Sequence, residues 1–220
     1  MYAPATPLPA APLAPVGIAA SSGANEAGAA LVVPPAHTAL RVRSFQLNVL
    51  ADHRASVTGT LLAARKPAPA GLSVSLQART RGGWRTLTRS DTKTGGRFHL
   101  RYLPRLIGSR MVRLRFAGVA ADLPSVHRLG RLNAYRQVEA SWYGGGGSLA
   151  CGGWLTSATL GVASRTLPCG TLVTLRYDGH VVRVPVVDRG PYVFGREFDL
   201  TEATKRALGF VGVGQVWSTS

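Results

Sequence analysis

Short stretches in which apolar and polar residues alternate recur about every ten residues between positions 41 and 117. A period of two is typical of a strand that buries one face, and glycine between such stretches indicates turns. The glycine pairs at 82–83 and 95–96 predict two hairpins. This pattern favours an antiparallel β-sandwich, immunoglobulin-like in architecture, over residues 41–118. The predicted strands are 41–49, 55–62, 72–79, 84–89, 97–102 and 111–117.

A second group of strand signals occupies residues 138–220, after a predicted linker at 119–137. The Asp178-Gly179 pair predicts a hairpin between strands at 171–177 and 180–187. Residues 200–210 predict a short helix that ends at Gly209. Asp199 and Glu202 have the spacing of a capping box, which predicts Asp199 as the N-cap of this helix.

Residues 1–40 are rich in alanine and proline and predict a disordered tail. In composition they resemble the leader of an exported protein, but they lack a positively charged first region and prolines interrupt the apolar run. We therefore expect a secreted or cell-envelope protein whose start is truncated. No stretch reaches the roughly 18 apolar residues of a transmembrane helix, so no transmembrane segment is expected.

The net charge of +16 is concentrated in the middle of the chain, where residues 41–136 contain 19 basic and 3 acidic residues. Such a field attracts polyanions, for which anionic cell-wall polymers, lipid head groups and nucleic acid are the candidates. The segment has no nucleic-acid motif with interleaved aromatic residues, so nucleic acid is not the expected partner. The alternative is an arginine-rich, solvated β surface that binds no ligand.

The run from Val187 to Tyr192 contains the strongest candidate for chemistry, Asp188. Asp188 follows a mostly apolar stretch, and Gly190 and Pro191 turn the chain just after it. A carboxylate at the end of a buried strand can be desolvated, which tunes its pKa for proton transfer. The alternative is that Asp188 only accepts hydrogen bonds from the backbone amides of the turn.

Five motifs between residues 140 and 210 follow one another in a specific order. They are AlaSerTrpTyrGly (140–144), ArgThrLeuProCysGlyThr (165–171), ValValAspArgGlyProTyr (186–192), PheAspLeuThr (198–201) and AlaLeuGlyPhe (207–210). In this order they resemble the double-psi β-barrel domain of the rare lipoprotein A (RlpA) family of septal-ring lytic transglycosylases. They are more distantly similar to the barrel of expansins. The resemblance covers residues 138–220 and implies a six-stranded double-psi β-barrel with a short helix.

The resemblance also implies a protein that acts on peptidoglycan or a related cell-wall glycan. It implies Asp188 as a catalytic acid/base, and it matches Asp199 and Ser141 to polar residues beside the expansin substrate. Trp142 and Tyr143 have faces that suit a sugar ring, although adjacent strand residues point to opposite sides and at least one should lie in the core. The full set of expected substrate-binding residues is Ser141, Trp142, Tyr143, Arg165, Arg189, Tyr192 and Asp199. Arg165 and Arg189 are expected to hold a substrate carboxylate or to brace Asp188.

Two departures from the family pattern keep a second interpretation open. Gly153 stands where these transglycosylases carry a glutamate, and Ser164 stands where they commonly carry a histidine. The first hypothesis is therefore a peptidoglycan lytic transglycosylase, and the second is a non-catalytic, expansin-like module that binds or loosens the wall glycan. A module that presents the barrel to a protein partner is the third.

The chain has two cysteines, Cys151 and Cys169. An even number in a protein expected to be exported predicts one disulfide. Closing a loop of about 18 residues stabilises a fold by roughly 3 kcal/mol in the chain-entropy model. Two thiols without a neighbouring pair of histidines fall short of a zinc shell, so neither a metal nor a cofactor is expected.

Overall fold

The computed structural model describes residues 34–220. Most of the predicted tail therefore lies outside the described residues. Its last part is not a tail, because strand β1 begins at Thr38 and pairs along its length with β3. Residues 34–220 are mainly β, with a closed six-stranded barrel and one short α-helix. No helix of residues 34–220 is long and apolar enough to cross a membrane.

The first group of elements extends from residue 38 to residue 143. Its members are β1 (Thr38–Gln46), β2 (Asn48–Leu50), β3 (Ala55–Ala63), β4 (Lys66–Pro67), β5 (Ser73–Thr80), β6 (Gly83–Asp91), the 3-10 turn η1 (Thr94–Gly96), β7 (Arg97–Tyr102), β8 (Gly108–Phe116) and β9 (Ser125–Tyr143). The strands predicted between residues 41 and 117 from the alternating pattern are present, except that the one predicted at 41–49 is divided into β1, which pairs with β3, and β2, which pairs with β9. The alternation therefore identified these strands correctly.

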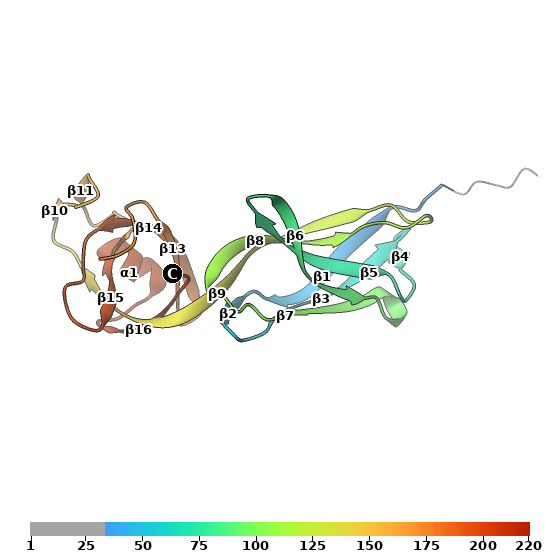
Figure 1. Ribbon diagram of the computed structural model, residues 1–220, viewed down its shortest axis with the longest axis horizontal. Coiled ribbons are helices and arrows are strands. Elements are labelled where there is room, and N and C mark those ends of the chain that lie inside the picture. Colours follow the sequence, from blue (N-terminus) through green and yellow to red (C-terminus); the bar gives the residue numbers. More distant parts are fainter. Residues whose placement is uncertain (1–33) are drawn as a thin grey trace, which may run out of the picture. The chain divides into compact units, whose positions relative to one another are not determined.

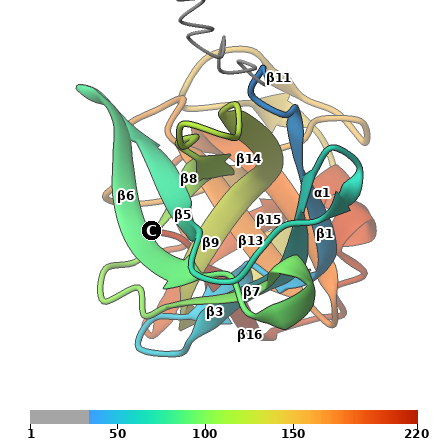
Figure 2. The ribbon, with the colours of Figure 1, turned by 90° about the vertical axis from the view of Figure 1, so that its right-hand side faces the viewer.

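The glycine pairs give one correct hairpin and one wrong one. Gly82 and Gly83 connect β5 and β6, which pair antiparallel, and Figure 2 shows these two strands side by side. Gly95 and Gly96 do not close a hairpin, because β7 pairs with β3 whereas β6 pairs with β5. The pair instead forms η1, in which both glycines have positive φ and the chain crosses between sheets.

Two sheets contribute to one hydrophobic core in this part of the chain. In the first, β3 pairs antiparallel with β1, β4 and β7; in the second, β5 pairs antiparallel with β6 and β8, and β8 with β9. The largest fully buried side chains of this core are Val57, Leu61, Val74, Leu76, Leu100, Leu114 and Phe116. An immunoglobulin-like topology stays a prediction.

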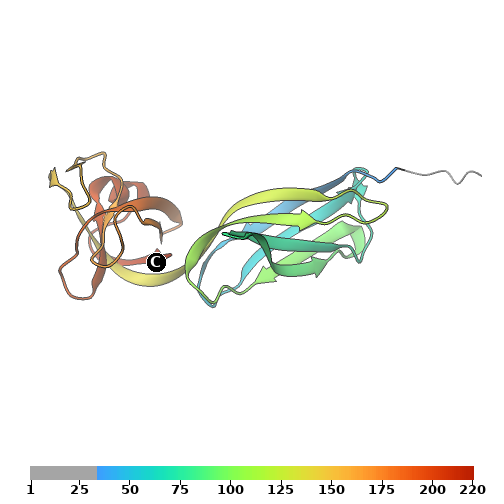
Figure 3. The ribbon, with the colours of Figure 1, turned by 45° about the horizontal axis from the view of Figure 1, so that its top comes forward.

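The predicted linker at 119–137 is wrong for most of its length. Strand β9 begins at Ser125 and is continuous to Tyr143, as the yellow-green to yellow ribbon in Figure 3 shows. Its first half pairs with β8 and its second half with β15 and β16. The first residues of β9 are largely exposed, so this half of the strand does not show the alternating burial of a half-buried strand.

The second group of elements completes the barrel. It consists of β10 (Gly147–Ser148), β11 (Trp154–Leu155), β12 (Val162–Ala163), β13 (Leu172–Tyr177), β14 (His180–Asp188), β15 (Arg196–Thr201), α1 (Glu202–Leu208) and β16 (Gly214–Ser218). Six strands form a ring in the order β15-β12-β14-β13-β16-β9, which closes because β9 also pairs with β15 (Figure 1). Its core includes Val173, Leu175, Phe198, Leu200, Leu208 and Val216, each fully buried. The predicted hairpin at Asp178-Gly179 is present between β13 and β14.

Helix α1 begins two residues later than predicted. Its N-cap is Thr201, whose side chain accepts a hydrogen bond from the Thr204 amide, so the prediction of Asp199 as N-cap is wrong. The segment containing Asp199 continues instead as strand β15, which pairs with both β9 and β12. Gly209 ends the helix in the left-handed conformation, as predicted.

A buried hydroxyl network joins the start of α1 to the segment before β12. The amide nitrogen of Gly161 lies 2.9 Å from Thr204 Oγ1 and 3.2 Å from Thr201 Oγ1, and its carbonyl accepts hydrogen bonds from the same hydroxyls. A Cβ on Gly161 would lie 2.4 Å from Val187 Cγ2, so only glycine fits. The network thus fixes the start of α1 against the segment that leads into β12, the strand that pairs with the Asp188 end of β14.

We expect Thr204→Val to lower the free energy of unfolding by about 1 kcal/mol, because it removes the shorter of the two hydroxyl hydrogen bonds to the buried amide and carbonyl of Gly161, while those of Thr201 remain. Urea unfolding of the full chain measures this. Thr166→Val is the matched control, since Thr166 is exposed, and it should change the free energy by less than about 0.5 kcal/mol. Equal effects of the two substitutions would contradict a stabilising role for the network.

Candidate functional site

Strand register places the two candidate carboxylates in one row across the barrel. Ser141 of β9 pairs with Asp199 of β15, Asp199 pairs with Ala163 of β12, and Ala163 pairs with Asp188 of β14. Since neighbouring strands lie about 4.8 Å apart, the Cα atoms of Asp188 and Asp199 are about 10 Å apart, on either side of Ala163. Four sequence-distant segments thus meet at a single level of the barrel.

Asp188 is half-buried at the last position of β14. Its Oδ1 accepts hydrogen bonds from the backbone amides of Ala150 at 2.9 Å and Arg189 at 2.8 Å. Both bonds fall on the same oxygen, so they fix the carboxylate and leave Oδ2 for a proton or a sugar oxygen. The alternative prediction, in which Asp188 accepts hydrogen bonds from backbone amides of the turn, describes this contact. The contact is compatible with a role of Asp188 in proton transfer.

Asp199 lies in a second, linked arrangement. Its Oδ1 accepts a hydrogen bond from the hydroxyl of Ser141, which is buried with 4% of its surface exposed. The Ser141 hydroxyl also lies 3.3 Å from Nη1 of Arg196, which donates to it. The arrangement places a carboxylate, a hydroxyl and a guanidinium together at the start of β15.

The turn after Asp188 approaches Asp199 closely. Gly190 has a φ of +132°, a conformation that favours glycine, and precedes a cis peptide bond to Pro191. A Cβ on Gly190 would lie 3.8 Å from Oδ2 of Asp199 and 3.9 Å from Cβ of Ala163. The turn that follows Asp188 therefore lies beside the carboxylate of Asp199.

Tyr143 directs a buried hydroxyl toward the same place. The oxygen makes no hydrogen bond of good geometry within residues 34–220. Burial raises the pKa of Tyr143 well above its usual value, and the nearby negative charges of Asp188 and Asp199 raise that pKa further. Tyr143 is therefore a neutral hydroxyl beside two carboxylates, available to donate a hydrogen bond to a ligand.

We expect two tyrosines to keep their protons when the pH rises past 11. Burial raises the pKa of Tyr135 to about 12, and that of Tyr143 is also raised. An unfolded tyrosine has a pKa of about 10, so the folded state binds these protons more tightly. Their contribution to stability is complete below about pH 10 and is lost as the pH rises toward the folded pKa.

Ultraviolet titration of tyrosinate in the native protein measures this directly. Tyr135→Phe and Tyr143→Phe should each remove one late-titrating group. The unmodified protein should become easier to unfold as the pH rises above about 10. If the Tyr143→Phe variant still showed both late-titrating groups, the Tyr143 hydroxyl would not be buried beside the two carboxylates as described.

The aromatic residues near the site divide as strand geometry requires. Trp142 is 41% exposed, with the Lys205 ammonium 3.6 Å from its ring centroid, whereas Tyr143 is half-buried. The loop after Pro191 carries Tyr192, 81% exposed, and Phe194, fully exposed. Trp142, Tyr192 and Phe194 are the aromatic surfaces that a polymer lying near the site can contact.

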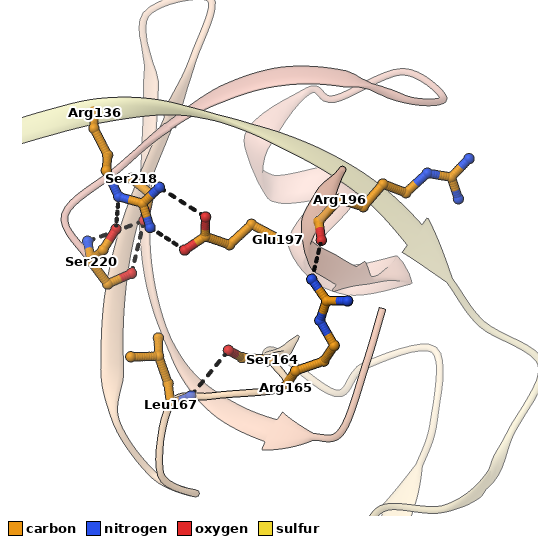
Figure 4. A network of polar contacts seen from close by, with 8 residues as sticks. All are labelled: Arg136, Ser164, Arg165, Leu167, Arg196, Glu197, Ser218 and Ser220. Atoms are coloured by element: carbon orange, nitrogen blue, oxygen red, sulfur yellow. Dashed lines mark hydrogen bonds and ion pairs between the residues drawn. The ribbon is translucent and has the colours of Figure 1, made fainter. Parts of the chain in front are cut away.

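The two predicted arginines have different surroundings. The guanidinium of Arg189 donates to the carbonyls of Ser164 and Leu167, both at 2.9 Å, so it braces the loop after β12 and not the carboxylate of Asp188. Arg165 is exposed and its Nη2 donates to the carbonyl of Arg196, as Figure 4 shows. Arg165 and Arg196 line a hollow of about 270 Å³ together with Thr166, Gly195 and Glu197.

Below this hollow, an ion pair anchors the start of β15. Arg136 binds Glu197 through both terminal nitrogens, and its Nε donates to the carbonyl of Ser220 at 2.7 Å. Figure 4 shows this cluster on the opposite side of β15 from the Arg196 side chain. Bidentate pairs of this kind fix orientation, so Arg136 positions the strand that carries Asp199.

The predicted disulfide between Cys151 and Cys169 is present. It holds the loop whose Ala150 amide binds Asp188, and the Cys151 amide donates to the Val187 carbonyl at 3.2 Å. Nη2 of Arg189 lies 3.1 Å from Sγ of Cys169. The disulfide is therefore part of the scaffold around Asp188.

The two positions that depart from the family pattern supply no acid or base. Gly153 is exposed, with a φ of +87°, in the loop before β11. Ser164 is buried, its amide donates to the Asp188 carbonyl at 3.1 Å, and its hydroxyl accepts from the Leu167 amide. Ser164 is therefore next to Asp188, but its hydroxyl stabilises the turn at residues 164–167.

Two site groups were not predicted from the sequence. Arg196 lies three residues before Asp199, and an irregularity in the β15–β9 register between residues 196 and 198 brings its guanidinium to Ser141. The Ala150 amide reaches Asp188 through the disulfide-bonded loop. A basic residue shortly before the PheAspLeuThr motif was the only sequence signal for Arg196, and nothing indicated Ala150.

Residues 135–217 match the protein-family model described as "Lytic transglycolase". This segment is an RlpA-like double-psi β-barrel, which confirms the resemblance expected from its motifs. A probable endolytic peptidoglycan transglycosylase RlpA from Aquifex aeolicus is 43% identical over 87 residues, covering 37% of this chain and 38% of the relative. A protein of the same name from a Synechocystis species is 36% identical over 110 residues, covering 43% of this chain and 34% of the relative.

Among solved structures, the Streptomyces papain inhibitor is similar with a TM-score of 0.30 and 23% identity, covering 37% of this chain and 92% of the inhibitor. The matched region spans less than two fifths of the length of the curated relatives named above. The family model covers the barrel and leaves residues 34–134 outside it.

Proposed function

We propose that this protein cleaves the glycan strands of peptidoglycan as a lytic transglycosylase, with Asp188 as the acid/base. The observation that carries the proposal is the placement of Asp188, half-buried at a strand end, with one carboxylate oxygen held by two backbone amides. A second carboxylate, that of Asp199, lies two strands away from Asp188, with Ala163 of β12 between them. The names of the relatives support the same substrate class for the barrel.

A single carboxyl group suffices for the proposed reaction. Asp188 in its acid form protonates the glycosidic oxygen, and the bond from that oxygen to the anomeric carbon breaks. The resulting carboxylate then takes the proton of the sugar's own 6-hydroxyl, whose oxygen attacks the anomeric carbon and closes a 1,6-anhydro ring. Asp188 thereby regains its proton, and no water enters the product, in contrast to ordinary glycoside hydrolysis.

The surrounding residues have supporting roles in this proposal. Asp199 supplies negative charge near the positive charge that develops at the anomeric carbon. Ser141 and Arg196 hold Asp199 in place, and Arg165 in the neighbouring hollow binds a carboxylate of the substrate. Trp142, Tyr143 and Tyr192 contact the sugar rings, whereas Arg189 braces the loop.

A second candidate function is a non-catalytic, expansin-like module that binds or loosens the wall glycan. The observation in its favour is that Gly153 has no side chain and that the Ser164 hydroxyl is bonded to a backbone amide. Such a module needs only binding contacts from Asp188, Asp199 and the aromatic residues.

Incubation of the full chain with purified peptidoglycan distinguishes the two functions. The lytic transglycosylase releases soluble fragments with 1,6-anhydro ends, which mass spectrometry identifies. Pelleting of the protein with the wall without any released fragment would replace the first function with the second.

We also propose that the protein is exported and consists of two domains, one from β1 to the first half of β9 and one from the second half of β9 to β16, which extends the predicted ranges 41–118 and 138–220 into this continuous strand. A disulfide is typical of oxidising compartments, and the two hydrophobic cores share no residue. Secretion assays with a tagged chain test the first point. Finding the protein only in the cytosol would contradict export.

Limited proteolysis tests the two-domain organisation. Digestion of both parts at one rate would contradict that organisation.

A further inference from the structure

A basic groove lies on the exposed face of the sheet formed by β1, β3 and β7, away from the barrel residues considered above. Its volume is about 1160 Å³. We call it the Arg97 groove. Its lining residues include Arg43, Lys93, Arg97, His99 and Arg101 together with the hydroxyl residues Thr58, Thr60, Ser90 and Thr94.

Strand alternation creates this surface. In β7, Phe98 and Leu100 point into the core, so Arg97, His99 and Arg101 all face outward. In the neighbouring strand, Thr60 pairs with Arg97 and Thr58 pairs with His99, which sets a row of hydroxyls beside the row of basic residues. Each residue of an antiparallel strand advances about 3.4 Å, so the positions of Arg97 and Arg101 lie about 14 Å apart, with His99 between them.

The charges of the Arg97 groove are not neutralised by the protein. No Asp or Glu is among its lining residues. Among residues 34–220, the ion pairs are Arg136–Glu197 and Arg206–Glu202, and neither involves the groove. Four permanent cations held in one groove repel one another, so an anionic ligand that enters it relieves this repulsion.

The floor of the groove selects against nucleic acid. Phe98 is 3% exposed, so its ring is covered and offers no face for a base to stack on. The exposed polar groups are hydroxyls, such as Thr58, which is hydrogen-bonded to Ser44 at 2.7 Å. Arginines and hydroxyls are suited to oxyanions, and the lining has no exposed Phe, Tyr or Trp ring on which successive bases could stack.

We propose that the Arg97 groove binds a linear polymer of repeated oxyanions that carries no nucleobases, of the polyol-phosphate type found in cell walls. The polymer lies along β7, with anions bound at Arg97 and at Arg101 and additional contacts to Arg43 and Lys93. The proposal concerns a surface outside the barrel, so it does not depend on whether the barrel cleaves glycan.

Fluorescence polarisation of the full chain with labelled poly(glycerol phosphate) tests the proposal. Four neutralised cations predict a loss of affinity of about 50-fold between about 50 and 200 mM salt. The triple variant Lys93→Gln/Arg97→Gln/Arg101→Gln should bind at least about tenfold more weakly at the lower salt, and its salt dependence should fall to about threefold. Because these side chains are on the surface, thermal unfolding should match the unmodified protein.

The matched control is Arg81→Gln/Arg85→Gln/Arg110→Gln, which removes the same number of charges from a different basic hollow. It should retain most of the affinity. An equal loss in this control would overturn the proposal, because binding would then reflect the overall charge.

Two further probes identify the polymer. A single-stranded DNA of equal charge should bind more weakly than poly(glycerol phosphate), and tighter binding of DNA through the same residues would overturn the base-free ligand. Polygalacturonate tests whether the oxyanion is phosphate or carboxylate. Groove-dependent binding of either polymer supports the shared oxyanion chemistry.

Discussion

Asp188→Asn is expected to lower the rate at which anhydro-muropeptides are released from peptidoglycan by at least about 100-fold, the range associated with loss of a general acid/base. Asparagine keeps the shape of the side chain, and its carbonyl oxygen can still accept the hydrogen bonds from the Ala150 and Arg189 amides. It cannot supply or take the proton. Stability and wall binding should therefore stay close to those of the unmodified protein.

Asp178→Asn provides a matched control for this prediction. Asp178 lies in the exposed turn between β13 and β14, with a φ of +42° that asparagine adopts readily. This variant should release products at the normal rate. If Asp188→Asn also retained that rate, Asp188 would not be the acid/base, whatever its position in the barrel.

Removal of the disulfide should have the largest effect on stability. The double substitution Cys151→Ser/Cys169→Ser opens a loop with a sequence separation of 18. The free energy of unfolding is expected to fall by roughly 3 kcal/mol, because the unfolded chain regains the conformations that the cross-link excludes. Urea unfolding followed by tryptophan fluorescence measures it, since Trp142, Trp154 and Trp217 lie in the barrel segment.

The same substitution should also weaken the site. The loop that contains Cys151 supplies the Ala150 amide to Asp188, so a looser loop leaves the carboxylate less well fixed. Reductant serves as the control, because it should destabilise the unmodified protein and leave the double variant unchanged. An unfolding free energy within about 0.5 kcal/mol of the original would contradict the stabilising role.

The strands were predictable because one-sided burial leaves a period of two in the sequence. The errors arose where pairing between distant segments decides the structure. Gly95 and Gly96 have the composition of a hairpin, yet the chain crosses to another sheet there. Asp199 has the spacing of an N-cap, but pairing of β15 with two strands extends the strand to Thr201. Local propensity could not reveal either partner.

The candidate site was predictable to the extent that its residues lie in recognisable motifs. Asp188, Asp199 and Ser141 were singled out from sequence, and register brings them into one row. The contribution of Arg196 depends on a local irregularity in strand pairing, and that of Ala150 on a backbone amide, which has no sequence signature. The contact of the Arg189 guanidinium with the carbonyls of Ser164 and Leu167 likewise depends on the fold and has no sequence signature.

Digestion of peptidoglycan in water enriched in oxygen-18 tests the central claim most directly. A transglycosylase closes the anhydro ring with the sugar's own oxygen, so the released fragments should have 1,6-anhydro ends and no heavy oxygen. Fragments with oxygen-18 at a reducing end would show that water attacks the glycan, which would contradict a mechanism in which Asp188 alone performs both proton transfers.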